Sequence, residues 1–165
     1  MTGTTVAPDA PSAAVGFAPD EVDLSMPTRA ARLKWVVVVN SDLPPGRAAN
    51  AAICAAAPTA VQVAGLLGTD VPDADGALHP GLPWLGCSVL TADSATLRAI
   101  RAKAAARPDT YVADMPAVAQ RTLVYTDYAA SMAGTAADDM DYCAVSIVGP
   151  RNRVDKIVGK LPLLP

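Results

Sequence analysis

Three acidic or basic side chains in this sequence stand where they could exchange protons with a substrate. Asp42 follows the valine run of WVVVVNSD, Asp114 ends the segment TYVAD, and His79, the single histidine, lies in DVPDADGALHPG. A carboxylate can serve as general acid or base, and histidine exchanges protons near neutral pH. We therefore predict Asp42, His79 and Asp114 as catalytic residues.

Six further residues could bind a substrate beside them. A helix is expected to begin near Gly46 after the Pro-Pro turn, and its free N–H groups would favour an anion or a developing oxyanion. Asn50 is unfavourable in an alanine-rich helix unless its amide has a partner, which makes it the preferred polar anchor. Cys54 would be a nucleophile only with a lowered pKa and a nearby base. The predicted substrate-binding residues are Ser41, Gly46, Arg47, Asn50, Cys54 and Trp84.

Most of these residues also have a purely structural interpretation. Asp42 could accept hydrogen bonds from the backbone of its own turn, and Asp114 could cap the helix that follows it. Arg47 could be a solvated surface charge. Cys54 could be a buried core thiol, and Trp84 could fill the core. Cys87 and Cys143 lie on predicted strands and are expected in the core. The sequence leaves these alternatives open.

The charges and cysteines of the chain exclude several kinds of site. A net charge of -3 and a pI near 4.9 leave no basic surface for nucleic-acid phosphates. The three cysteines form neither a CxxC pair nor a disulfide framework. One histidine among scattered aspartates matches neither zinc nor calcium spacing. We expect no metal, no organic cofactor and no nucleic-acid partner.

The chain is predicted to form one domain behind a leader. Residues 1–28 are rich in Ala, Pro, Thr, Ser and Asp without a period, which indicates a flexible N-terminal leader. Residues 29–165 are long enough for a single core. No apolar run approaches the roughly 20 residues that cross a bilayer, and the N-terminus lacks signal-peptide features. With free thiols as well, we expect a cytoplasmic protein without membrane contact.

Strand-like and helix-like segments alternate through the domain. KWVVVVN, LGCSVLTA, TYVADMP and DYCAVSIVG predict strands, and helices are predicted after each of them. The valine run is β-branched throughout, which is typical of a central strand that is buried on both faces. The alternation predicts a three-layer α/β/α sandwich with a mixed, mostly parallel sheet of about four strands.

These elements would position the candidate residues at one end of the sheet. Asp42 follows the carboxyl end of the first strand, where ligands bind in open α/β sheets. We expect the long loop at residues 68–84, which carries His79 and Trp84, to close over that end and enclose a cavity. If the first and third strands are neighbours, Asp114 faces the same cleft.

Three segments carry a resemblance to a known family: KWVVVVNSDLPPGRAANAA, DADGALHPGLPW and VSIVGPRNRVDKIVGKLPLL. Over Lys34 to Leu164 the chain resembles the domain of unknown function 2000 family, which is similar in fold to the type II peptidyl-tRNA hydrolases. The resemblance implies a type II peptidyl-tRNA hydrolase-like fold. The match to the hydrolases themselves is confined to the first strand, turn and helix and to the GP…VDKIVGKL ending.

The resemblance to the hydrolases fails at their functional side chains. Their first helix typically opens DLxMGKGKxAAQCSHA, and their DAGRTQ segment falls near MAGTAA here. A lysine, a glutamine, a histidine and an aspartate of that pattern are replaced by Ala49, Ile53, Ala56 and Met132. The resemblance therefore implies loss of proton transfer and phosphate pairing. We do not expect this chain to cleave peptidyl-tRNA.

These observations predict a small-molecule enzyme that needs no cofactor. It would be a hydrolase or cyclase that acts at a carbonyl or imine carbon, with Asp42 as acid or base and His79 as proton exchanger. Asn50 and the helix-start amides would bind the oxyanion. The competing prediction is a non-catalytic ligand-binding or homodimeric interaction module, because small residues give flat helix surfaces.

Overall fold

The computed structural model describes residues 15–165, which are built around a four-stranded sheet with the strand order β4-β1-β6-β5. β1 runs parallel to β4 and antiparallel to β6, and β5 is antiparallel to β6. The sheet is mixed and β1 is central, as predicted, but one parallel and two antiparallel pairs do not make it mostly parallel. The strands are β1 (Leu33–Asn40), β4 (Ser88–Ala92), β5 (Tyr111–Pro116) and β6 (Tyr142–Pro150).

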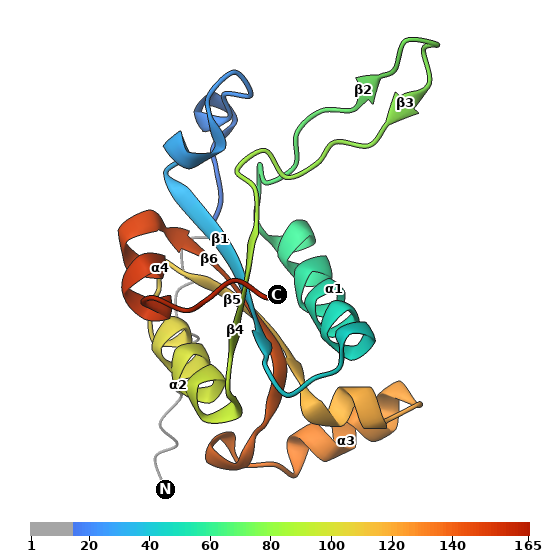
Figure 1. Ribbon diagram of the computed structural model, residues 1–165, viewed down its shortest axis with the longest axis vertical. Coiled ribbons are helices and arrows are strands. Elements are labelled where there is room, and N and C mark those ends of the chain that lie inside the picture. The colour runs from blue at the N-terminus through green and yellow to red at the C-terminus, as the bar shows by residue number, and fades with distance from the viewer. Residues whose placement is uncertain (1–14) are drawn as a thin grey trace, which may run out of the picture.

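The difference arises from the connection into β6. β5 is followed by three short helices: η3 (Ala117–Arg121), α3 (Tyr125–Ala133) and η4 (Ala137–Asp139). None of the three contains a buried residue. These helices stay beyond the end of the sheet instead of returning the chain across it (Figure 1). β6 therefore enters from the end where β5 stops and runs between β5 and β1, so β1 and β5 are not neighbours.

Helices cover both faces of the sheet, which gives the predicted three layers (Figure 1). Alternate residues of a strand point to opposite faces. Trp35, Val37 and Val39 of β1 pack on the side of α1 (Pro45–Gln62), in one core cluster. Val36 and Val38 face a second cluster. This second cluster is covered by α2 (Ser94–Ala105) and α4 (Arg151–Val158).

α1 lies close to the sheet because its inner face is made of small side chains. Ala48, Ala51, Ala55 and Thr59 recur at helical spacing and are all buried. Pro45 is the first helical residue, a position where a missing N–H is tolerated. The helix continues past Pro58 and ends at Gln62.

A buried chain of hydrogen bonds crosses from the sheet to α1. The indole N–H of Trp35 donates to Ser146 Oγ at 2.8 Å, and Ser146 Oγ lies 2.7 Å from Thr59 Oγ1. Thr59 Oγ1 donates its only proton to the Ala55 carbonyl at 2.9 Å. Ser146 must therefore be the donor to Thr59, and the indole N–H and both hydroxyl groups of this network each have a hydrogen-bond partner.

The ordered domain begins earlier than residue 29. Phe17 is buried, with its ring 4.8 Å from that of Trp84. Arg32 Nε and Nη2 donate to the two carboxylate oxygens of Glu21 at 2.8 and 2.9 Å. The segment also forms η1 (Pro19–Glu21) and η2 (Thr28–Ala30). Residues 15–28 thus pack on the domain, and the rest of the predicted leader, residues 1–14, lies outside the described residues.

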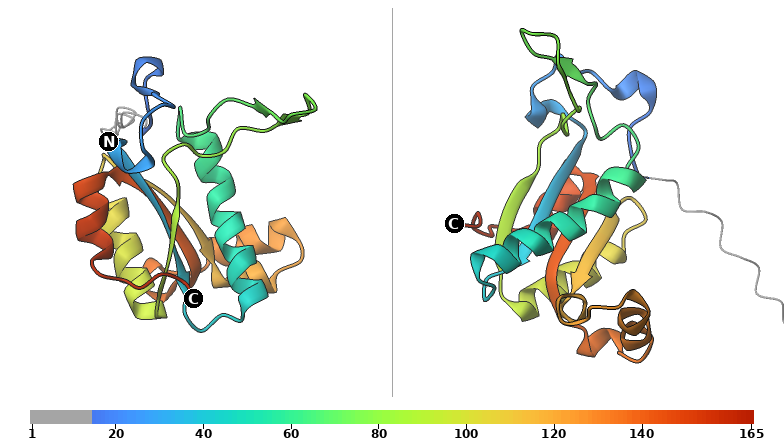
Figure 2. Two further views of the ribbon diagram at one scale, coloured as in Figure 1. Left: turned by 45° about the horizontal axis from the view of Figure 1, so that its top comes forward. Right: turned by 90° about the vertical axis from the view of Figure 1, so that its right-hand side faces the viewer.

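Two further segments complete the molecule. β2 (Val71–Pro72) and β3 (Leu78–His79) form a separate antiparallel pair on an extension that projects beyond the end of α1 (Figures 1 and 2). The C-terminal tail runs along the free edge of β4, where the Leu164 amide donates to the Val89 carbonyl at 3.0 Å. Within residues 15–165, no helix has both the length and the apolar character needed to span a membrane.

Candidate functional site

β1 and β4 end side by side, and the helices that follow them leave on opposite faces of the sheet. The last register pair of the two parallel strands is Asn40 and Ala92, and the Ser41 amide donates to the Ala92 carbonyl at 2.9 Å. Adjacent parallel strands with helices on opposite faces form a topological switch point, where open α/β sheets bind ligands. We call this end of the sheet the carboxyl edge and take it as the candidate site.

The turn from β1 into α1 is held by Asn40. Its Oδ1 accepts the Asp42 N–H at 2.9 Å, and its carbonyl accepts the Leu43 N–H at 3.3 Å. Asn40, and not Asp42, therefore makes the turn's side-chain-to-backbone bond. Asp42 is exposed, and no described residue hydrogen-bonds to its carboxylate.

α1 starts at the carboxyl edge with uncapped amides. Its N-cap is Pro44, which provides no side-chain bond, and the first backbone bond runs from Ala48 N–H to the Pro44 carbonyl. The N–H groups of Gly46 and Arg47 are thus left without a backbone partner. α2 starts at the same edge, but Asp93 caps it by accepting the Thr96 N–H at 2.8 Å. The Asp93 carboxylate thus already occupies the positive end of α2, whereas no side chain of a described residue caps α1.

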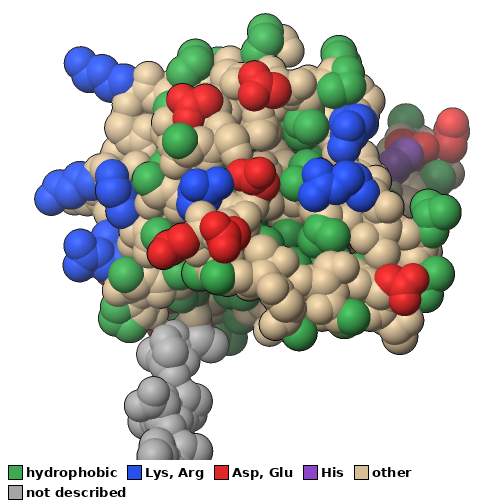
Figure 3. All heavy atoms as spheres, turned by 90° about the horizontal axis from the view of Figure 1, so that it is seen from below, with side chains coloured by type: hydrophobic (Ala, Val, Ile, Leu, Met, Phe, Trp, Pro, Cys, Tyr) green, Lys and Arg blue, Asp and Glu red, His purple; other side chains and the backbone are tan. Residues whose placement is uncertain are grey.

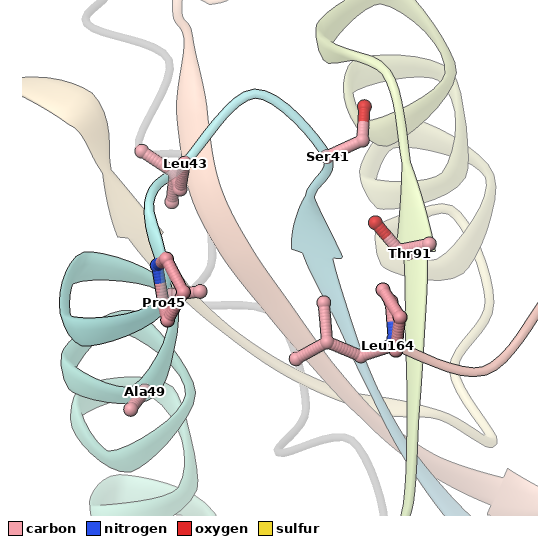
Figure 4. A pocket seen from close by; sticks show the side chains of 8 residues that line it. Ser41, Leu43, Pro45, Ala49, Thr91 and Leu164 are labelled. Carbon is pink, nitrogen blue, oxygen red and sulfur yellow. The ribbon is translucent and has the colours of Figure 1, made fainter.

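An apolar pocket of 340 Å³ lies on one side of the start of α1. The turn and α1 form one wall, and β4 with the C-terminal tail forms the other (Figure 4). Ser41, one of the predicted substrate-binding residues, lines it, and Thr91 provides a second hydroxyl, which donates to the Val39 carbonyl at 3.2 Å. The apolar lining includes Leu43, Pro45, Ala48, Ala49 and Leu164.

A second and more polar pocket, of 530 Å³, lies along another side of α1. Four residues of α1 that were predicted to bind a ligand line it, together with Met115 and two residues of η3. They come together because they fall on one side of the helix over two turns. The lining residues are Gly46, Arg47, Asn50, Cys54, Met115, Ala119 and Gln120.

Gln120 joins the polar side chains of this pocket into one network. Its Nε2 donates to the Arg47 carbonyl at 2.9 Å and to Asn50 Oδ1 at 3.2 Å, while its Oε1 accepts Arg47 Nε–H at 2.8 Å. Asn50 therefore has the amide partner that its place in the helix requires. Arg47 is exposed but is oriented by this hydrogen bond, and its two terminal nitrogens have no partner among the described residues.

Sequence reasoning missed Gln120 and Thr91 as site residues. Gln120 follows β5, whose end lies at the carboxyl edge because β5 runs in the same direction as β1. Thr91 is the penultimate residue of β4, beside β1. The sequence shows each of them as a polar residue near the end of a predicted strand. That position identifies a site residue only when the strand order is known, because the strand order decides which strand ends lie together.

Comparison with known proteins fits this architecture. The family model described as "Protein of unknown function (DUF2000)" matches residues 33–165. The chain belongs to the DUF2000 family. A solved structure of a protein of unknown function from Agrobacterium tumefaciens superposes with a TM-score of 0.75 at 19% identity, over 81% of this chain and 98% of that one. At this identity the match shows the shared fold alone. No curated protein matches the chain.

Cys54 of this DUF2000 domain is exposed in the polar pocket, so the alternative of a buried core thiol is wrong. No histidine or carboxylate lines that pocket to serve as its base. Cys87, expected in the core, is also exposed. Cys143 is buried, as predicted, and burial raises the pKa of its thiol.

His79 and Trp84 lie at the opposite edge of the DUF2000 sheet, so the predicted cavity shared with Asp42 does not form. α1 has 18 residues, which at 1.5 Å per residue carry the chain about 27 Å back toward the start of β1. His79 is exposed, with Nε2 3.3 Å from Asp73 Oδ2, and Trp84 donates to the Gly65 carbonyl at 2.7 Å. Seen from the carboxyl edge, the single histidine lies far back on a projection (Figure 3).

Asp114 is also separated from Asp42. Its side chain points to the face covered by α2, where Oδ2 accepts Arg101 Nε–H at 3.0 Å. The polar pocket lies on the α1 side of the sheet. Asp114 does not cap η3, whose N-cap is Pro116. The third predicted catalytic residue is therefore an ion-pair partner of α2, and the two aspartates do not share a cleft.

The α2 side of the carboxyl edge is occupied by paired charges. Asp141 Oδ1 accepts Ser94 Oγ–H at 2.9 Å and Arg98 Nη2–H at 2.8 Å, and these two contacts hold the pKa of Asp141 below its usual range. Acidic and basic side chains alternate over this face (Figure 3). Within residues 15–165, no three His, Cys, Asp or Glu side chains cluster closely enough to hold a metal ion.

Proposed function

We propose that this DUF2000 domain binds a small molecule that carries an anionic group, at the start of α1. The observation that supports this best is the Arg47–Gln120–Asn50 network around the polar pocket. Gln120 engages Nε of Arg47 and leaves both terminal nitrogens to donate parallel hydrogen bonds to a carboxylate or a phosphate. The free N–H groups of Gly46 and Arg47 lie at the positive end of the α1 dipole and favour the same charge.

The pocket is large enough for a metabolite. Its 530 Å³ falls within the range of about 300–1,000 Å³ that is common for small-molecule sites. Asn50 and Gln120 can each both donate and accept, which suits polar groups next to the anion. The ligand class is therefore a small, polar carboxylate or phosphate compound.

The test uses small anions as probes and one arginine variant. Amide spectra recorded during titration with inorganic phosphate and with acetate should shift at Gly46 and Arg47. Arg47→Ala should lower the affinity at least roughly tenfold, because a charge-assisted pair contributes about 1.5–3 kcal/mol. Arg107→Ala, an exposed arginine beyond the end of α2, is the matched control. Equal affinity of the Arg47→Ala protein and the wild type would remove this site.

Catalysis by Asp42 is a second candidate function. Its carboxylate is exposed on the turn into α1 and is not bonded by any described residue, so it is free to exchange protons with a ligand. The domain would then be a hydrolase or cyclase that acts at a carbonyl or imine carbon without a cofactor. With a ligand in hand, Asp42→Asn should abolish turnover and retain binding. Unchanged turnover would exclude Asp42.

We also infer that the scaffold is related to the type II peptidyl-tRNA hydrolases and that their activity is absent. The first strand, turn and helix and the GP…VDKIVGKL ending support the relation. Ala49, Ile53 and Ala56 cannot transfer protons or pair with phosphates. Incubation with peptidyl-tRNA should show no cleavage, and robust cleavage would contradict the inference.

The exposed free thiols favour a reducing compartment such as the cytoplasm.

A further inference from the structure

The segment at residues 68–83, which we call the arm, extends from the domain, and none of its residues is buried. Figures 1 and 2 show it projecting past the end of α1. Every residue from Thr69 to Pro80 is exposed. Its β-ladder consists of two register pairs, Val71 with His79 and Pro72 with Leu78. An isolated two-stranded hairpin is at best marginally stable in water, so a partner surface would stabilise the arm considerably.

Internal hydrogen bonds nevertheless give the arm a defined shape. Asp73 Oδ1 accepts the N–H groups of Asp75 and Ala77, each at 2.9 Å, and Gly76 adopts a positive φ of 84° at the turn. At the base, the Gly68 N–H donates to the Leu82 carbonyl at 2.9 Å. The arm is therefore a preformed hairpin, which reduces the entropy cost of docking.

The arm carries large apolar side chains into solvent. Val71, Leu78 and Leu82 retain 56%, 69% and 79% of their full exposure. At the base of the arm, Leu24 and Met26 are also exposed and, together with Val71, His79 and Leu82 of the arm itself, line a mainly apolar pocket of 750 Å³. Exposed apolar side chains next to an apolar pocket are typical of a protein–protein contact.

Charge is separated across the same end of the molecule. The arm holds three aspartates, Asp70, Asp73 and Asp75, and its only basic side chain is His79. A neighbouring pocket of 370 Å³, at the start of β1 and β4, is lined by three cations, Arg29, Lys34 and Arg151. Lys34 is paired with Asp155 at 2.6 Å and Arg151 donates to backbone carbonyls, whereas Arg29 has no partner among the described residues.

We propose that the arm is the dimerisation element of this protein and that it docks on a second copy of the same chain. One end of the molecule carries both halves of a complementary pair: an acidic, apolar arm, and a surface with the basic pocket and with the apolar pocket that the base of the arm itself helps to line. A two-fold rotation places each arm against the pockets of the other copy, as in an isologous interface. The opposite charges of arm and basic pocket then fix the orientation.

The first test measures the oligomeric state of the full chain by sedimentation equilibrium. The wild type should be a dimer at micromolar concentration. Leu78→Asp should raise the dimer dissociation constant at least roughly tenfold, because it places a charge at a desolvated apolar contact. The matched control is Leu123→Asp, which alters a fully exposed leucine outside the arm, before α3. Circular dichroism of both variants should match that of the wild type.

The second test reverses charges. Asp75→Lys and Arg29→Glu should each weaken the dimer, and the double variant should recover affinity over the weaker single variant because the pair is exchanged. A wild type that stays monomeric would overturn the proposal. A dimer that is unaffected by Leu78→Asp, or one that is broken by Leu123→Asp instead, would also overturn it. Absence of recovery in the double variant would exclude pairing of the arm with the basic pocket.

Discussion

Ser146 shows how one small polar residue can connect the two layers on the α1 side. It accepts from Trp35, donates to Thr59, and is fully buried, so neither neighbour can turn to water for a replacement partner. From the sequence, Ser146 is a polar residue in an apolar strand without an evident partner. The indole and the hydroxyl that satisfy it come from residues about a hundred positions away.

We predict that Ser146→Ala destabilises the domain by about 1–3 kcal/mol, because the buried indole N–H of Trp35 loses its acceptor. Urea unfolding followed by tryptophan fluorescence measures the change. Ser131→Ala is the control, because Ser131 is exposed and its hydroxyl donates only to the Asp127 carbonyl in its own helix. The control should stay within about 0.5 kcal/mol of the wild type. Equal effects of the two substitutions would contradict the buried network.

A second prediction at residue scale concerns the charge of the polar pocket. Gln120→Glu retains an acceptor for Arg47 Nε–H but adds a carboxylate that competes with an anionic ligand for the guanidinium. Binding of phosphate or acetate should weaken at least roughly tenfold. Gln62→Glu adds the same charge at the far end of α1 and should leave binding unchanged. If both variants bind like the wild type, Gln120 does not border the ligand.

At the scale of elements, the two ends of α1 separate two surfaces. Its start, with free amides and Arg47, borders the pockets of the carboxyl edge, and its end leads into the arm. Because a helix that follows a strand returns the chain to where that strand began, a loop after α1 cannot cover the tip of β1. The assumption that residues 68–84 close over Asp42 failed for this reason.

The turn of the arm should depend on the ionisation of Asp73. The hydrogen bond from the Ala77 amide has the largest effect in holding the pKa of Asp73 below its ordinary value, and the contact with His79 has the next largest. The carboxylate therefore stabilises the turn at neutral pH, and this stabilisation is lost as the pH falls through the lowered pKa. The Ala77 amide resonance should titrate with a midpoint below that of a free aspartate, and its exchange should accelerate at low pH. In the Asp73→Ala variant this titration of the Ala77 amide should be absent. A midpoint in the wild type above the ordinary aspartate value would show that the hydrogen bonds of the turn do not favour the ionised form.

At the scale of the whole molecule, the arm and the body are separable. The two core clusters contain no residue between Leu66 and Trp84. The ends of the arm already lie together, since Leu67 pairs with Pro83. Stability of the body therefore rests on the sheet and its helices rather than on the arm.

Replacement of residues 70–80 by two glycines should leave a cooperatively folded domain, because no buried contact is removed. Thermal unfolding followed by circular dichroism should show a single transition close to that of the Leu78→Asp variant, which also lacks the proposed dimer contact. Phosphate binding at the start of α1 should also be preserved. Gly149→Ala provides the contrast: its new Cβ would lie 2.7 Å from Thr110 Cγ2 inside the sheet, so the transition should fall. Loss of cooperative unfolding in the arm variant would show that the arm belongs to the body.

The sequence by itself determined the local features of this protein. The valine run is buried on both faces, as its β-branched composition predicts, and α1 begins within one residue of the expected start near Gly46. It also brought Gly46, Arg47, Asn50 and Cys54 to one pocket, because their spacing on a helix sets their side. Such features depend on residues only a few positions apart.

The tertiary structure alone decided which distant residues meet. Alternation along β5 means that Asp114 and Met115 face opposite sides, but only the pairing of β5 with β6 assigns Asp114 to α2 and Met115 to the polar pocket. The insertion of β6 between β1 and β5 depends on helices that do not recross the sheet. Strand order is set by the burial of many side chains together, and no single segment encodes it.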